Sequence, residues 1–99
     1  MKLDFTLRAL GEIERAKRNW LARRDKNPAL FELELAAVVE TIKTVPALGS
    51  PSGMSRGRLV RRLPMIETQY TVYYRQDAPD QVYVLRVWGG RRGMQPQFR

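Results

Sequence analysis

The spacing of the apolar residues changes twice along the chain, and these changes limit the folds that are open to it. Apolar and polar residues alternate over Lys2–Arg8, which is typical of a half-buried β-strand. From Ala9 to Thr44 the apolar residues recur every three or four positions, as on the buried side of a helix. Alternation returns after Gly57. The sequence therefore predicts helices enclosed between strands.

The helical part divides at the segment "DKNP" (25–28) into two amphipathic helices. The apolar side of the first helix carries Leu10, Ile13, Ala16 and Trp20. The second helix is expected over about Pro28–Thr44, with Asn27 as its N-cap and an apolar side made of Phe31, Leu35, Val38, Ile42 and Val45. Pro46 ends it and forces Val45 out of helical geometry. The short link predicts an antiparallel helical hairpin.

Three more strands are expected after a loop over residues 46–57. They cover Arg58–Leu63, Tyr70–Gln76 and Val82–Trp88, and the link "DAPD" (77–80) is typical of a hairpin turn. The predicted order is β-α-α-β-β-β. This order indicates an α+β fold, with the helical hairpin packed on a small antiparallel sheet in a single domain of residues 1–99.

Composition narrows the function classes. The chain has no cysteine and no histidine, so thiolate and imidazole metal ligands are excluded, and we expect neither a metal nor a cofactor. The longest wholly apolar run is Leu35–Val39, too short to cross a bilayer. The N-terminal residues lack the continuous apolar segment of a secretory signal. We therefore expect a cytoplasmic protein that has no membrane partner.

The positive charge is concentrated in the second half of the chain. Residues 1–49 carry nine Lys/Arg against seven Asp/Glu, whereas residues 50–99 carry nine arginines, no lysine and three acids. Arginine binds carboxylate or phosphate through two parallel hydrogen bonds, which lysine cannot do. An all-arginine half therefore predicts contacts with anionic groups, although a genome rich in G and C would also favour arginine.

Alternation divides the last two strands between two faces. We assign to the helix side Tyr70, Val72, Tyr74, Tyr83, Leu85 and Val87. The opposite face then carries Tyr73, Arg75, Val82, Val84, Arg86 and Trp88. An uncovered apolar patch among arginines is typical of a protein-binding hot spot. In the alternative interpretation, part of the loop over residues 46–57, or a second copy of the chain, covers this face.

The stretch "VYVLRVWGGRRGMQP" (82–96) ends the last strand with two glycines and two arginines. Gly89 and Gly90 are expected to turn the chain sharply after Trp88, because glycine tolerates backbone conformations that other residues avoid. The turn would place Arg91 and Arg92 near other arginines of the sheet, namely Arg86, Arg61 and Arg62. We predict an anion-binding rim there; the alternative is that these arginines protect the sheet edge from aggregation.

In the order and spacing of these segments the chain resembles the ParE/RelE superfamily of toxins from bacterial type II toxin–antitoxin modules. The resemblance covers nearly the whole chain and includes "VPALGSP" (45–51), "RLVRRLP" (58–64), "YTVYYR" (70–75) and the C-terminal stretch. It implies a small acidic antitoxin, ParD-like or similar, whose C-terminal segment wraps the toxin. A toxin–antitoxin hetero-oligomer is therefore expected.

The resemblance implies different activities for the two branches. RelE-like members cleave messenger RNA on the ribosome, whereas ParE-like members poison DNA gyrase. RelE-like nucleases carry an arginine after the aromatic residue of the penultimate strand, where this chain has Thr71. Their other basic residues are matched by Arg58, Arg61 or Arg62 and by Arg91 or Arg92, but their C-terminal tyrosine has no counterpart. With no histidine, the chain also lacks the usual general base, and arginine is a poor one.

The sequence thus favours a ParE-like, non-enzymatic poison of DNA gyrase that is neutralised by an antitoxin. The alternatives are a RelE-like ribosome-dependent mRNA endonuclease and a detoxified relative that only binds its antitoxin. No catalytic residue is expected. The residues expected to bind the target or the antitoxin are Arg61, Arg62, Tyr73, Arg75, Val82, Val84, Arg86, Trp88, Arg91 and Arg92.

Overall fold

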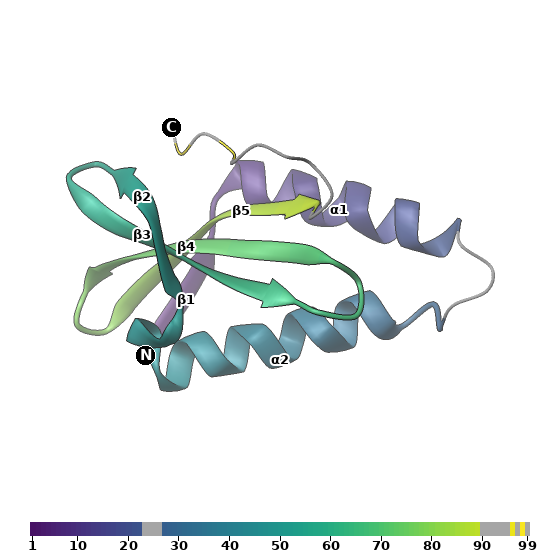
Figure 1. The fold of residues 1–99 in the computed structure, drawn as a ribbon, viewed down its shortest axis with the longest axis horizontal. Coiled ribbons are helices and arrows are strands. Elements are labelled where there is room, and N and C mark those ends of the chain that lie inside the picture. The colour runs from purple at the N-terminus through teal and green to yellow at the C-terminus, as the bar shows by residue number, and fades with distance from the viewer. Residues whose placement is uncertain (23–26, 90–95, 97, 99) are drawn as a thin grey trace.

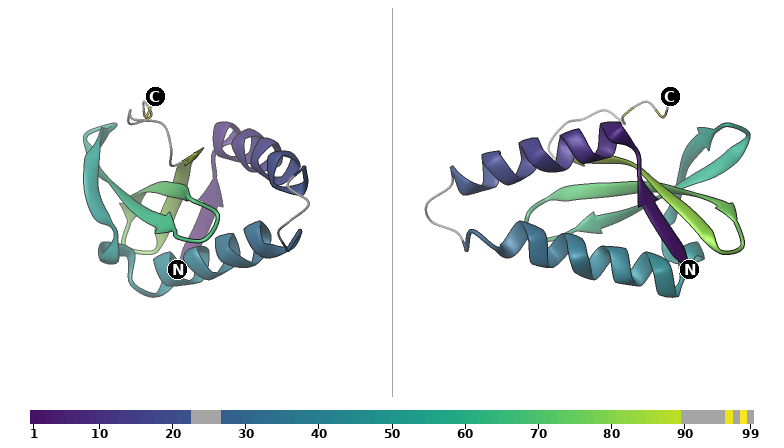
Figure 2. Two further views of the ribbon diagram at one scale, coloured as in Figure 1. Left: turned by 45° about the vertical axis from the view of Figure 1, so that its right-hand side comes forward. Right: turned by 180° about the vertical axis from the view of Figure 1, so that it is seen from behind.

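Two helices lie on one side of a five-stranded sheet in the computed structural model, which describes residues 1–22, 27–89, 96 and 98 (Figures 1 and 2). The elements are β1 (Lys2–Phe5), α1 (Leu7–Leu21), α2 (Leu30–Thr44), the 3-10 helix η1 (Pro46–Leu48), β2 (Ser50–Ser55), β3 (Arg58–Met65), β4 (Tyr70–Ala78) and β5 (Gln81–Gly89). The strand order is β1-β5-β4-β3-β2. No helix among these residues is long and apolar enough to cross a membrane.

The predicted α+β fold is confirmed, with two differences in the sheet. An additional strand, β2, lies in the segment that was expected to be a loop, and it forms the sheet edge beside β3. Its serines, proline and glycine hide it from strand patterns, but an edge strand tolerates such residues. The sheet is also mixed, because β1 runs parallel to β5, with Leu3 opposite Val82.

Thr6 is the N-cap of helix α1, and its Oγ1 accepts a hydrogen bond from the amide of Ala9 (3.1 Å). Its predicted buried residues Ile13, Ala16 and Trp20 are confirmed, but the prediction for Leu10 is wrong, because this side chain is 45% exposed. The buried position on that side of the helix belongs instead to a charged residue, Glu12. The spacing of apolar residues cannot predict that a charged side chain such as Glu12 is buried.

Helix α2 begins two residues later than predicted, but Asn27 does organise its start. Its Oδ1 accepts the amide of Ala29 (3.0 Å), and its main-chain oxygen accepts the indole N–H of Trp20 (2.8 Å), which ties the start of α2 to the end of α1. At the other end, Val45 leaves helical geometry at φ −135°, as expected before Pro46. Val45 is 47% exposed, so its predicted place on the buried side is wrong.

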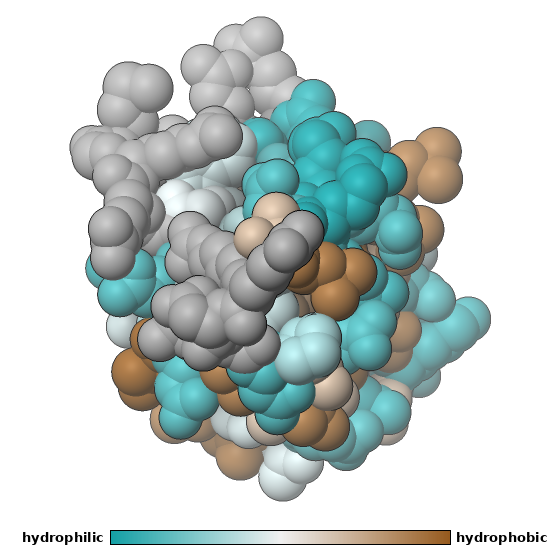
Figure 3. Space-filling model, turned by 90° about the vertical axis from the view of Figure 1, so that its right-hand side faces the viewer, coloured by the Kyte–Doolittle hydropathy of each residue, from teal (hydrophilic) through white to brown (hydrophobic). Residues whose placement is uncertain are grey.

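The main core fills the space between both helices and the sheet. Phe31 and Ile42 of α2 pack with Val72 and Tyr74 of β4, and the rings of Phe31 and Tyr70 meet edge to face at 5.2 Å. Some large apolar side chains stay on the surface, among them Leu21, Leu33 and Ile66. At the end of the molecule where the helices are joined, hydrophobic residues lie in small groups among hydrophilic ones (Figure 3).

Glu34 of α2 fastens the helix to the turn between β3 and β4. Its carboxylate accepts hydrogen bonds from the amides of Glu67 (2.8 Å) and Thr68 (3.0 Å) and from the Thr68 hydroxyl (2.6 Å). Burial alone would raise the pKa of this carboxyl, but the three hydrogen bonds together lower the pKa below its ordinary value. The folded state therefore favours the ionised form.

Replacing Glu34 with Gln should make the chain less sensitive to acid. Because the folded-state pKa is lowered, the carboxylate contributes stability above its unfolded-state pKa and loses it as the pH falls through the folded-state pKa. At pH 7 we expect E34Q to cost about 1–3 kcal/mol, the usual effect of losing hydrogen bonds to a charged acceptor. Urea unfolding from pH 2 to pH 7 should show the parent and E34Q converging at low pH. The exposed Glu40 supplies the control, E40Q, and equal pH profiles for E34Q and the parent would contradict this role.

Candidate functional site

The sheet face opposite the helices, which we call the open face, carries part of the predicted site. Tyr73, Arg75 and Trp88 lie there, with Tyr73 opposite Arg86 and Arg75 opposite Tyr83. The placement predicted for Val82 and Val84 is wrong, because both are 0% exposed and belong to the core under the helices.

A β-bulge explains this error. Tyr73 is paired with Arg86 and the next residue of β4, Tyr74, with Val84, so Leu85 is an extra residue in β5. Two consecutive residues, Leu85 and Arg86, therefore face the same side, and the alternation shifts by one position. Tyr83 and Leu85 thus belong to the open face, although we had assigned them to the helix side.

The open face also has a small core of its own. Val60, Tyr73 and Leu85 are buried there, and the ring of Phe98 packs on Tyr73 with 5.3 Å between the ring centroids. The hydroxyl of Ser55 in β2 donates to the main-chain oxygen of Phe98 (2.9 Å). The expected uncovered apolar patch is therefore wrong. Phe98 lies on this small core, whereas of residues 46–57 only Ser55 and Arg56 reach the pocket beside it, so the alternative in which that segment covers the face stays a prediction.

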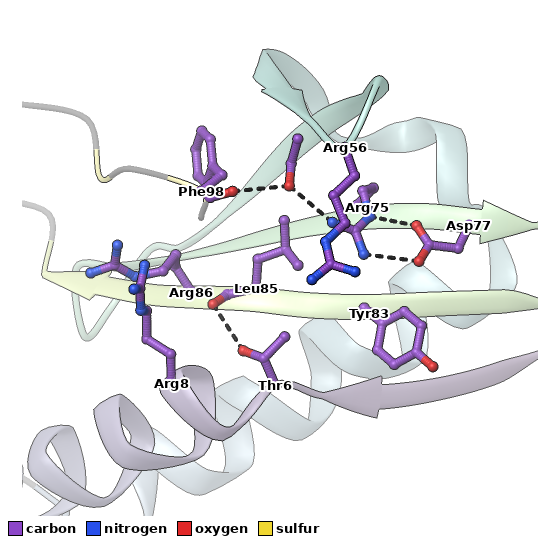
Figure 4. A pocket seen from close by; sticks show the side chains of 10 residues that line it. Thr6, Arg8, Arg56, Arg75, Asp77, Tyr83, Leu85, Arg86 and Phe98 are labelled. Carbon is purple, nitrogen blue, oxygen red and sulfur yellow. Dashed lines mark hydrogen bonds and ion pairs between the residues drawn. The ribbon is translucent and has the colours of Figure 1, made fainter.

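A pocket of about 330 Å³ lies on the open face beside this small core (Figure 4). Its lining combines four arginines with one carboxylate and apolar side chains: Thr6, Arg8, Ser55, Arg56, Arg75, Asp77, Tyr83, Leu85, Arg86 and Phe98. The start of α1 forms one wall, because the Thr6 hydroxyl donates to the main-chain oxygen of Leu85 (3.1 Å). The pocket thus joins positive charge to apolar contact area.

Arg75 is a buried part of this pocket, not an exposed contact. Its guanidinium donates to both oxygens of Asp77 and to the hydroxyl of Ser55 (2.9 Å). The hydrogen bond from Arg75 lowers the pKa of the Asp77 carboxyl, and the charges of Arg75, Arg58 and Arg56 lower it further. Asp77 is therefore ionised at neutral pH and orients Arg75 inside the pocket wall.

Arg86 connects the sheet to α1. Its guanidinium forms hydrogen bonds of 2.7–3.1 Å to both carboxylate oxygens of Glu12, and Glu12 also accepts the amide of Val87 (2.9 Å). The same guanidinium lies 4.6 Å from the centroid of the Trp88 ring, a distance at which cation–π attraction operates. Arg86 thus positions Trp88 at the side of the open face.

The other predicted arginines are more dispersed. Arg61 donates to the oxygen of Gly49 (2.8 Å), whereas Arg62 donates to Pro51 and Ser52 of the neighbouring β2 (3.3 Å each). Adjacent strand residues point to opposite faces, so only Arg62, opposite Tyr73, belongs to the open face. Arg91 and Arg92 lie outside the described residues. Gly89 is the last residue of β5 and keeps an ordinary φ.

The open face offers little for general acid–base chemistry. Burial raises the pKa of the Tyr73 hydroxyl, although the charge of Arg62 opposes the rise, while the pKa of Asp77 is lowered. Both groups move away from neutrality, where a general base works best. Thr71 of β4, at the position where RelE-like nucleases carry an arginine, is paired with Trp88 of β5. Among the described residues no cluster of acidic side chains could hold a metal ion.

Sequence reasoning missed two of the four arginines of the pocket, Arg8 and Arg56. Arg8 was assigned to the end of the first strand, but it lies in the first turn of α1. Arg56 lay in the presumed loop. The segment "SRGR" (55–58) could have predicted the turn that carries Arg56, because a residue followed by glycine can form a two-residue hairpin turn.

The chain is similar to one protein family in sequence and to a solved structure in fold. The family model described as the ParE toxin of the type II toxin–antitoxin system, parDE, matches residues 3–94. A solved structure described as the chromosomal ParDE TA system from P. aeruginosa is similar in fold, with a TM-score of 0.62 and 16% sequence identity over 90% of this chain and 95% of the other. No curated protein matches the chain.

Proposed function

We propose that this chain, which belongs to the ParE toxin family of type II toxin–antitoxin systems, is a cytoplasmic poison of DNA gyrase that a cognate antitoxin neutralises. The observation that carries this proposal is the pocket of the open face, which combines arginines with apolar side chains. Such a surface binds another macromolecule through charge-assisted hydrogen bonds and apolar contacts. It needs no catalytic group of its own to do so.

The alternative of messenger RNA cleavage has weaker support in this geometry. Attack by a ribose 2′-hydroxyl requires a base with a pKa near neutrality. The chain has no histidine, and two tyrosines of β4, Tyr73 and Tyr74, are unsuited, because burial raises the pKa of both. The C-terminal tyrosine of RelE-like nucleases has no counterpart here, since Phe98 lacks a hydroxyl. Inhibition by binding is therefore the better-supported activity.

Purified gyrase should lose supercoiling activity when this chain is added, and linear DNA should accumulate in a cleavage assay. We expect the double variant R91K/R92K to need a concentration about tenfold higher for the same effect, because lysine keeps the charge but loses the bidentate hydrogen bonds. Circular dichroism should show an unchanged fold. The assay should be repeated with the co-purified antitoxin, which should restore supercoiling.

Two results would contradict the proposal. Gyrase that keeps supercoiling at a large molar excess of the chain would remove gyrase as the target. Discrete cleavages in the ribosomal A site, detected by toeprinting and abolished in R91K/R92K, would instead assign the chain to the RelE-like branch. An R91K/R92K variant as inhibitory as the parent would not contradict gyrase as the target, but would show that the arginines of the pocket suffice for binding.

A further inference from the structure

The turn between β2 and β3 contains an arginine in an unusual backbone conformation. Ser55 is opposite Arg58, so only Arg56 and Gly57 connect the strands, and both have positive φ, 52° and 74°. This is the pattern of a type I′ hairpin turn, in which asparagine or aspartate is favoured at the first position. A left-handed arginine is sterically disfavoured there. A conformational cost at a turn is typical of residues with a functional role.

The side chain of Arg56 points from the hairpin tip into the pocket, toward Leu85 and Tyr83 (Figure 4). Its charge lowers the pKa of Asp77 in addition to the larger effect of Arg75, so the guanidinium lies near this carboxylate. In the part of the chain that the structure describes, however, Asp77 is hydrogen-bonded to Arg75, and the other carboxylate beside the pocket, Glu12, is bonded to Arg86. The Arg56 guanidinium is therefore available to a ligand.

The pocket is better suited to one carboxylate than to a polyphosphate. The lining carries four arginines against one ionised carboxylate, Asp77, so its net positive charge attracts a single carboxylate. A volume of about 330 Å³ is at the small end of ligand pockets and admits a single side chain. Leu85, Tyr83 and Phe98 supply apolar surface for the methylene groups of an acidic residue.

We propose that the pocket binds an acidic side chain of the antitoxin, and that Arg56 is the residue which holds its carboxylate. The inference rests on the proposed function, since it requires an antitoxin partner. The left-handed turn fixes the backbone of Arg56 before binding, so that no backbone freedom is lost at this residue in the complex. The paired arginines, Arg75 and Arg86, shape the pocket wall and add positive potential.

The test replaces Arg56 with Asn, the residue that a type I′ turn prefers, so that the fold is preserved. R56N should melt at the same temperature as the parent or higher. In titration calorimetry with the purified antitoxin of the same module, its affinity should be about tenfold lower or worse, and R56K should be intermediate. R18Q supplies the control, because it removes one exposed arginine charge of α1 outside the pocket, and it should bind about as tightly as the parent.

Changing each acidic residue of the antitoxin to its amide then identifies the bound carboxylate. One such change should have no further effect in the R56N background, because the two partners share one interaction. If R56N binds the antitoxin as tightly as the parent does, the role of Arg56 in the pocket is overturned, but the antitoxin is still a partner of the chain. If R56N instead loses only binding to a single-stranded oligonucleotide, the pocket is a nucleic-acid site and the inference is wrong. If the parent does not bind the antitoxin at all, the proposed function is wrong, and the inference about the pocket is wrong with it.

Discussion

Replacing Glu12 with alanine should lower the free energy of unfolding by about 3–5 kcal/mol, because it removes the carboxylate that neutralises the buried charge of Arg86. The two side chains are only 7% and 12% exposed, and Glu12 also accepts the amide of Val87, which would lose its acceptor as well. In a domain of this size the melting temperature should fall by more than about 12 °C. Calorimetry and urea unfolding at pH 7 measure both quantities.

Two variants isolate the reason for this loss. Glu14 lies on the same helix, is 64% exposed and forms only a 3.7 Å ion pair with Lys17, so E14A should cost less than about 0.5 kcal/mol. The double variant E12L/R86M replaces both charges with apolar groups and should recover most of the stability that E12A loses. If E12A is as mild as E14A, the pair does not hold α1 on β5.

Apolar spacing predicted the elements better than it predicted the faces of the sheet. The stripe of α1 and the alternation of β4 placed Ile13, Val72 and Tyr74 correctly, because each element is regular over those residues. In β5 the extra residue at Leu85 shifts the alternation by one. A bulge depends on the pairing with the neighbouring strand, and no property of "VYVLRV" (82–87) reveals it. Val82 and Val84 were therefore assigned to the wrong face.

The candidate site was predicted only partly in its residues. The excess of arginine in the second half predicted contacts with anionic groups, and of the predicted arginines Arg75 and Arg86 line the pocket. Arg8 and Arg56 were missed, because the pocket brings together the start of α1 and the β2–β3 turn, which lie far apart in the sequence. The predicted interaction roles of Arg62 and Trp88 stay predictions, as do those of Arg91 and Arg92.

The segment "VPALGSP" (45–51) packs around the side chain of Tyr74. The Tyr74 hydroxyl donates to the main-chain oxygen of Pro46 (2.6 Å) and accepts the amide of Gly49 (2.9 Å). Arg61 donates to the oxygen of Gly49 from the neighbouring strand (2.8 Å). These contacts hold η1 and the start of β2 against the sheet. The open face depends on them, because β2 supplies Ser55 and the turn that carries Arg56.

Replacing Gly49 with alanine should therefore destabilise the chain by about 2–5 kcal/mol, from overpacking together with a displaced hydrogen bond. Its backbone is extended, with φ −63°, so space and not conformation requires glycine. A Cβ at this position would lie 2.5 Å from the Tyr74 hydroxyl and 2.9 Å from the main-chain oxygen of Arg62. The tyrosine is 1% exposed and cannot move away without opening the core. Urea unfolding at pH 7 measures the loss.

Gly11 gives the matched control, because a Cβ there approaches nothing closer than 4.0 Å and the residue lies inside α1. G11A should stabilise the chain by about 0.5–1 kcal/mol, the usual gain in a helix interior. Y74F alone should cost about 1–3 kcal/mol, since it leaves two buried polar groups without their partner. Combined with G49A it should cost less than the sum of the two single changes, because the clash with the hydroxyl disappears. Additive losses would show that the Arg62 backbone and the Tyr74 ring, not the Tyr74 hydroxyl, require glycine at this position.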